Sequence, residues 1–134
     1  MIKTITQIIN VLKKLIPLLQ EQLRLKKNEE MVRRICKEEG LTLQETNRIC
    51  KVIHCESGFD EKAIWVNIDG SKDLGLIQAN TNWYIQKMGL LTYDEAINNP
   101  EKCVRIMIRR YKEGFLKDWA CYKTQRWQDF SGTI

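Results

Sequence analysis

The first forty residues carry apolar side chains at intervals of three and four, the spacing of one face of an α-helix. Between residues 1 and 27 these positions are Ile5, Ile8, Ile9, Leu12, Leu15, Ile16, Leu19 and Leu23. Pro17 predicts a kink or a restart inside this pattern, because proline removes a backbone N–H donor and crowds the preceding turn. Asn28 is then expected to cap a second helix that runs to Glu39 and stops at Gly40.

This N-terminal segment, residues 1–40, is basic. It holds nine Lys or Arg and five Asp or Glu, so its net charge is 9 − 5 = +4, whereas residues 41–134 carry 13 − 12 = +1. Asn10, Lys13 and Lys14 interrupt the apolar run, which therefore never reaches the roughly 20 residues of a membrane span. We expect this amphipathic helical segment to pack on the domain formed by residues 41–134. The alternatives are a helix that lies on a membrane surface and a helix that binds a partner protein.

The pattern from residue 41 onward predicts a predominantly helical α+β domain. A capping box formed by Thr42 and Glu45 begins a helix over Leu43–Glu56. An Asp69-Gly70 pair is typical of a hairpin turn and predicts short strands over 63–67 and 72–74.

Three more segments follow the hairpin. Residues 76–86 read as helical or mixed. A second capping box, Thr92 with Glu95, starts a short helix over 92–98. Asn99-Pro100 then opens a long helix with one apolar face.

Two carboxylates lie on either side of the hairpin turn in different environments. Glu56 falls within about 20° of Ile49 on the apolar face of its helix, near the negative end of the macrodipole, and both effects raise its pKa. Asp73 follows the turn, between Ser71 and Gly75, and should be wetter and stay ionised. Such a pair suits glycosidic cleavage, in which one carboxyl protonates the leaving oxygen and the other faces the developing oxocarbenium ion.

The ordered residues around this pair resemble the lysozyme-like superfamily. The resemblance includes animal-type lysozymes and the small secretion-associated lytic transglycosylases of the soluble lytic transglycosylase family. It covers about 80 residues, Leu43 to Tyr122, and its most specific positions are Glu56-Ser57, Asp69-Gly70-Ser71, Asp73, Gly75-Leu76, Gln78, Asn80 and Trp83.

The resemblance implies a lysozyme-like fold with a small β-hairpin beside the active-site cleft. It makes Glu56 the general acid/base and Asp73 the second catalytic carboxylate. Ser57 and Gln78 would support the acid and line the cleft, and Asn80 would brace the loop. The substrate-binding residues that we expect are Ser57, Gln78, Asn80, Trp83, Trp119 and Tyr122.

The expected reaction is cleavage of the β-1,4 bond between N-acetylmuramic acid and N-acetylglucosamine in peptidoglycan glycan strands. It would proceed by hydrolysis, as in a lysozyme, or with a 1,6-anhydro product, as in a lytic transglycosylase. The alternative is a non-catalytic glycan-binding or structural module with the same fold. An enzyme of this kind acts at the bacterial cell wall. Since no cleavable signal peptide is recognisable, we expect delivery by a phage-like particle, by lysis or by a specialised secretion machine.

The remaining chemistry indicates no metal and no cofactor. His54 is expected to face solvent and has no cysteine at ligand spacing. The odd set of cysteines has no CxxC spacing and mainly apolar neighbours, which favours small buried thiols over a disulfide framework. They are Cys36, Cys50, Cys55, Cys103 and Cys121. No nucleic-acid recognition motif accompanies the basic start, so we expect no nucleic-acid partner.

Overall fold

A single long helix dominates the N-terminal region of the computed structural model, which describes residues 4–129. Helix α1 spans Ile5–Glu38 and begins with a capping box at Thr4. Residues 1–3 of the predicted N-terminal segment and residues 130–134 of the predicted domain lie outside the described residues.

The predicted restart of the helix after Pro17 is wrong. Helix α1 is continuous through Pro17, and Asn28 lies in its interior and does not cap a new helix. Pro17 is exposed, where water can satisfy the carbonyl left without an N–H partner. The Asn28 side-chain amide donates instead to the Phe59 carbonyl at 2.9 Å. This hydrogen bond from the Asn28 side chain helps to attach α1 to the domain.

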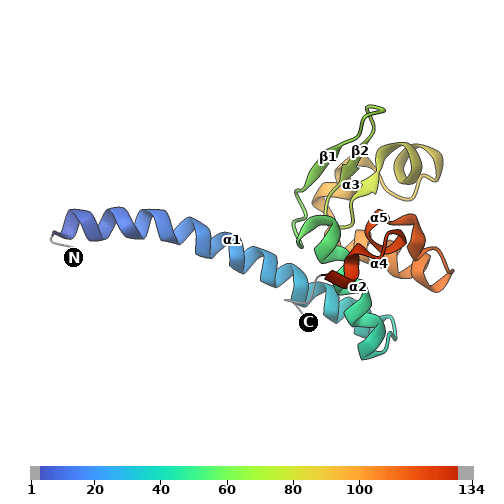
Figure 1. Cartoon of the computed structure of the whole chain (residues 1–134), viewed down its shortest axis with the longest axis horizontal. Helices are drawn as coiled ribbons and strands as arrows, with labels where there is room; N and C mark the ends of the chain where they lie inside the picture. The colour runs from blue at the N-terminus through green and yellow to red at the C-terminus, as the bar shows by residue number, and fades with distance from the viewer. Residues whose placement is uncertain (1–3, 130–134) are drawn as a thin grey trace.

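Helix α1 packs on the domain only through its second half. Val32, Ile35 and Cys36 are fully buried. Arg24 forms salt bridges with carboxylates in the loop that follows the second helix. By contrast, every residue from 4 to 23 is exposed. Figure 1 shows this first half projecting away from the rest of the molecule, so the expectation that the whole segment packs on the domain fails for these residues.

The core lies between α1, α2 (Leu43–Ser57) and α4 (Pro100–Lys112). The capping boxes predicted at Thr42 and Thr92 are confirmed, at the starts of α2 and of α3 (Tyr93–Asn98). Large side chains that are fully buried include Ile35, Ile49, Val52, Ile53, Leu74, Leu76, Ile77, Val104, Met107 and Ile108. Helix α2 ends at Gly58 in the left-handed conformation, which reverses the chain toward the sheet.

A three-stranded antiparallel sheet forms one side of the domain. The predicted hairpin is present as β1 (Ile64–Val66) and β2 (Lys72–Leu74), and a short third strand, β3 (Ala79–Asn80), pairs with β2. The chain is therefore α+β and mostly helical, as the sequence predicts.

Two backbone positions in this region require glycine. Gly70 has φ of +86° in the hairpin turn, where the Asp69 carboxylate accepts hydrogen bonds from the N–H and hydroxyl of Ser71. Gly75 has φ of +73°, and a Cβ there would lie 1.9 Å from the Ala96 carbonyl oxygen. Both glycines thus fix the backbone around Asp73.

The remaining elements are short and close the domain. They are η1, a π-helix over Thr81–Lys87; η2, a 3₁₀ turn over Leu116–Asp118; α5 (Ala120–Lys123); and η3, a 3₁₀ turn over Arg126–Asp129.

The cysteines correct one prediction and confirm another. Cys55 and Cys121 form a disulfide that joins the end of α2 to α5, with their Cα atoms 6.1 Å apart, so the prediction against disulfides is wrong for this pair. The other three are buried free thiols, as expected: Cys36, Cys50 and Cys103. The pair was hidden in the sequence because its members lie 66 positions apart and meet only when the chain folds back.

His54 also differs from its prediction. It is half-buried near the end of α2, and its ring stacks on that of Phe59 with the ring centroids 5.8 Å apart. The turn at Gly58 folds Phe59 back over the helix, a contact that a helical wheel alone does not contain.

Candidate functional site

A cavity of about 270 Å³ lies between the end of α2, the sheet and the segment around α5. It brings together two carboxylates that are 17 positions apart in the sequence, Glu56 from α2 and Asp73 from β2. The lining side chains, within the described part of the chain, are Glu56, Asp73, Gln78, Asn80, Tyr84, Asp118, Trp119 and Ala120.

Glu56 is positioned by the last turn of α2 and by one backbone donor. Its Oε1 accepts a hydrogen bond from the Cys121 N–H at 3.0 Å. That N–H belongs to the first turn of α5, where backbone donors have no partner inside the helix. The disulfide links Cys121, the donor of this hydrogen bond, to Cys55, which directly precedes the acceptor Glu56. It therefore holds the donor and the acceptor close together.

The surroundings of Glu56 keep its carboxyl protonated to higher pH than usual. Burial is the largest effect and raises its pKa, because the charged form loses water. The negative charge of Asp73 raises the pKa further, whereas the Cys121 N–H and the Arg126 guanidinium lower it. The net direction is upward. Since the Cys121 N–H already donates to Oε1, a proton on this carboxyl belongs on Oε2.

Asp73 is held by the sheet and by one side chain. In the ladder it is paired with Trp65 of β1 on one side and with Asn80 of β3 on the other. The Asn80 side-chain amide donates to Asp73 Oδ1 at 2.9 Å and to the Ser71 hydroxyl at 3.1 Å. Asn80 Oδ1 in turn accepts the N–H groups that begin η1. Asn80 therefore braces the loop, as expected, and also orients the second carboxylate.

Gln78 lines the cavity in a strained backbone conformation. Its φ is +53°, which is uncommon for a residue with a side chain. Its amide nitrogen donates to the carbonyls of Ala63 and Gly75, at 3.0 and 2.9 Å. These bonds connect the loop after β2 to the start of β1. The side-chain nitrogen of Gln78 therefore stabilises the loop, although the residue lines the cavity.

Trp119 lies at the wall of the cavity. It is almost fully buried, its indole N–H donates to the Ile77 carbonyl at 2.6 Å, and its ring stacks on Tyr84 with the centroids 5.3 Å apart. Tyr84 also donates its hydroxyl to the Asp118 carboxylate, which pairs with Arg110. This cluster forms a rigid aromatic side of the site.

Three predicted site residues lie outside the lining of this cavity. The Ser57 hydroxyl donates to the Leu76 carbonyl at 2.6 Å and fastens α2 to the loop after β2. Trp83 is 41% exposed, with the Lys87 ammonium 4.3 Å from its ring centroid. Tyr122 is half-buried and stacks on Trp127. Their placement gives Ser57 a supporting role and leaves Trp83 and Tyr122 outside the lining of the cavity.

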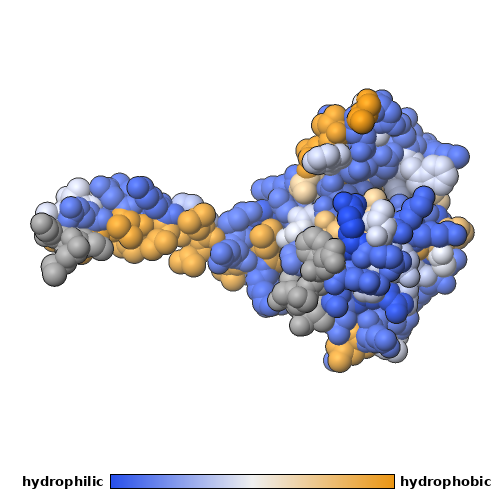
Figure 2. Space-filling view, in the orientation of Figure 1, coloured by the Kyte–Doolittle hydropathy of each residue, from blue (hydrophilic) through white to orange (hydrophobic). Residues whose placement is uncertain are grey.

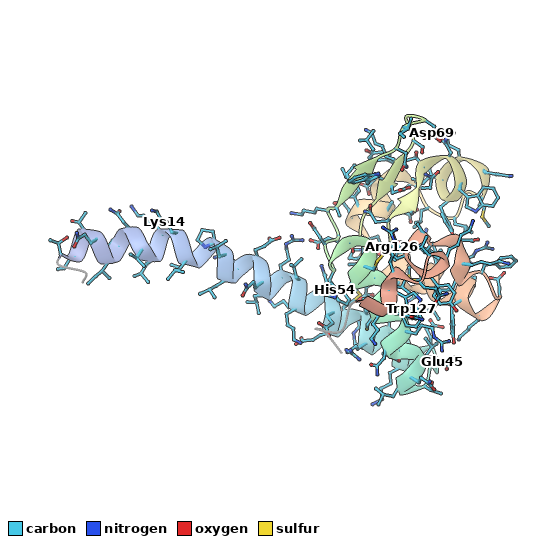
Figure 3. All side chains as sticks on the ribbon, viewed as in Figure 1. Lys14, Glu45, His54, Asp69, Arg126 and Trp127 are labelled. Carbon is cyan, nitrogen blue, oxygen red and sulfur yellow. A yellow bond between two sulfur atoms is a disulfide. The ribbon has the colours of Figure 1, made fainter. Side chains whose placement is uncertain are left out.

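Four contributors to the site are not predicted from the sequence: Tyr84, Asp118, the backbone of Cys121, and Arg126. Figure 3 shows Arg126 toward the middle of the domain and Asp69 at the far tip of the hairpin. An acid such as Asp118 in a loop reads as an ordinary surface charge. A backbone donor has no signature in the sequence at all, and only the disulfide could have pointed to it.

A second and more open hollow, of about 570 Å³, adjoins the first. The two share Asp73 and Asn80. Trp65, Val66 and Ile68 give the second hollow an apolar wall, and all three are well exposed. The hairpin thus extends the site beyond the two carboxylates. Within residues 4–129, no three His, Cys, Asp or Glu side chains gather as the ligands of a metal ion would, either at this site or away from it.

Comparison with known proteins adds no assignment. No protein-family model matches the chain, and a comparison with curated proteins gives no match either. Function is therefore inferred from the residues and their geometry.

Proposed function

We propose that this chain is a peptidoglycan-cleaving glycosidase with a lysozyme-like fold, and that Glu56 is its general acid/base. The observation that carries the proposal is the pairing of a half-buried Glu56, whose pKa is raised by burial, with Asp73 in one cavity. Two carboxyl groups in different environments match the requirements of glycosidic cleavage. The resemblance of the surrounding residues to lysozymes and lytic transglycosylases supplies the substrate, the β-1,4 bond between N-acetylmuramic acid and N-acetylglucosamine.

The first step would use both carboxyl groups. A proton on Oε2 of Glu56 passes to the glycosidic oxygen while the bond between that oxygen and the anomeric carbon breaks. The leaving sugar departs with a new hydroxyl, and positive charge develops at the anomeric carbon. Asp73, held in place by Asn80, is the nearby negative group that favours this charge.

The second step returns a proton to Glu56 and decides the product. If water attacks the anomeric carbon, Glu56 accepts a proton from that water and the product has a reducing end. If the 6-hydroxyl of the muramic acid sugar attacks, its proton goes to Glu56 and a 1,6-anhydro ring forms. The same residues serve both outcomes.

The adjoining hollow favours a substrate of several sugar units rather than a single sugar. Pyranose rings present apolar faces that pack on aromatic side chains, and Trp65 is exposed beside Asp73 through its pairing in the sheet. Figure 2 shows exposed apolar side chains along the hairpin. A glycan strand that lies over the carboxylates would therefore reach this surface as well.

Mass spectrometry of the products tests the proposal. Purified protein is incubated with isolated peptidoglycan, and the soluble fragments are weighed before and after borohydride reduction. Fragments that take up hydrogen have reducing ends and indicate a lysozyme; fragments that do not, and are lighter by one water, indicate a lytic transglycosylase. Retained binding to peptidoglycan with no released fragment would favour the non-catalytic module instead.

A further inference from the structure

The first half of α1 is the largest apolar feature that the domain does not cover. Every large apolar side chain from Ile5 to Leu23 is exposed, between 41% at Val11 and 75% at Ile5. At about 1.5 Å per residue this part of the helix is roughly 28 Å long. Figure 2 shows its apolar side chains as a continuous stripe along the projecting helix.

The apolar face of this segment is unusually wide. At about 100° per residue, its apolar positions fill an arc of about 180°, from Leu18 at one edge to Ile9 at the other. Among residues 5–23, only Gln22 interrupts that arc. Pro17 falls near the middle of the opposite, polar arc, so it leaves the apolar face unbroken.

This width does not fit pairing with a second copy. A two-stranded coiled coil buries positions a and d and places charged residues at e and g. With Ile5 at position a, this segment is apolar at a, d, e and g, and two helices would leave both flanks in water. A flat apolar surface covers the whole arc.

The charges indicate which flat surface. Lys13 lies about 40° beyond the Ile9 edge and Lys14 about 40° beyond the Leu18 edge, so one lysine borders each side of the apolar arc. Figure 3 shows Lys14 on the projecting part of the helix. Lysines in this position extend their apolar stems over a bilayer and place their ammonium groups among lipid phosphates.

The rest of the segment keeps this surface cationic. Its one acid in the described part, Glu21, is paired with Arg24. Lys26 and Lys27, both exposed, follow where the apolar arc ends and the helix reaches the domain. No helix among residues 4–129 is long and apolar enough to cross a membrane, so the helix would lie in the interface.

We propose that residues 5–23 of α1 bind the surface of an anionic lipid bilayer, with the apolar arc in the acyl region and the lysines at the phosphates. The proposal is independent of the glycosidase activity. It holds the domain at a membrane surface through a helix that the domain itself leaves free.

Vesicle co-sedimentation of the full chain tests this. We expect binding to vesicles of equal parts phosphatidylglycerol and phosphatidylcholine, and weaker binding to phosphatidylcholine alone. The double variant Leu12→Gln/Leu15→Gln should lose binding, since it places two polar side chains in the arc. The matched control Thr6→Gln/Asn10→Gln changes the polar arc and should bind as the wild type does. Lys13→Gln/Lys14→Gln should weaken binding to the anionic vesicles by about fivefold per lysine.

Three results would overturn the proposal. The first is no binding of the wild type to either vesicle. The second is equal binding by the Leu12→Gln/Leu15→Gln variant, with helix content and stability unchanged by circular dichroism. The third is self-association in sedimentation velocity that this variant abolishes, without any vesicle binding, which would make a second copy the occupant. Glu56→Gln should bind vesicles normally, so failure here and failure of the glycosidase proposal are distinguishable.

Discussion

At the scale of single residues, Glu56 is a half-buried carboxyl whose pKa is raised chiefly by burial. Its helix places it on the apolar face, and the sequence predicts this from its spacing to Ile49. The donor to its carboxyl, the Cys121 N–H, comes from 65 residues away and was not predictable, because a backbone group carries no sequence signal. The same holds for Arg126, whose charge acts on Glu56 only after the chain has folded.

The raised pKa of Glu56 has a consequence for stability. Because the pKa is higher in the folded protein, the folded state keeps a proton that the unfolded chain releases near the ordinary glutamate value. The stabilisation is therefore complete at low pH and is lost as the pH rises through the folded-state pKa. Glu56→Gln cannot ionise, so its melting temperature should exceed that of the wild type near neutral pH.

Thermal melts from about pH 4 to about pH 7 would check this. The gap between Glu56→Gln and wild type should grow as the pH rises. Thr6→Gln, at an exposed position on α1 that does not titrate, is the control and should show no such growth. A gap that is constant or shrinks with rising pH would mean that burial does not raise the Glu56 pKa.

At the scale of elements, the capping boxes and the hairpin were predictable because local side chains determine them. Strand β3 was not, since Ala79-Asn80 is too short to show alternation and is stabilised by pairing with β2. The continuity of α1 through Pro17 was also missed. Local propensity favours a break there, but the proline is exposed on the polar side of α1, where water can satisfy the carbonyl that loses its N–H partner.

The Cys55–Cys121 disulfide should contribute strongly to the attachment of α5 to α2. It closes a loop with a sequence separation of 66, for which loss of chain entropy in the unfolded state predicts about 4 kcal/mol. Urea unfolding with and without dithiothreitol measures this contribution. The Cys55→Ser/Cys121→Ser variant should match the reduced wild type and be insensitive to dithiothreitol. Equal stability of the oxidised and reduced wild type would show that the bond does not constrain the fold.

At the scale of the whole molecule, a small domain with a carboxylate-lined cavity is joined to a helix that projects from it, as Figure 1 shows. The sequence predicts a basic helical segment over residues 1–40 and a domain over residues 41–134. In the structure, Val32, Ile35 and Cys36 of α1 belong to the core of the domain, and residues 4–23 project from it. An amphipathic helix folds back onto its domain only if the domain has enough exposed apolar surface to cover it. That surface forms when the chain folds, so the sequence alone does not reveal it. The two proposals together describe a glycan-cleaving domain held at a lipid surface.

The most direct measurement of the central claim is the initial rate at which soluble fragments are released from peptidoglycan by three proteins: wild type, Glu56→Gln and Glu30→Gln. We expect release by the wild type, an equal rate for Glu30→Gln, and a loss of at least about 100-fold for Glu56→Gln, since a general acid contributes on that order or more. Equal rates for Glu56→Gln and wild type, or no release by the wild type, would contradict it.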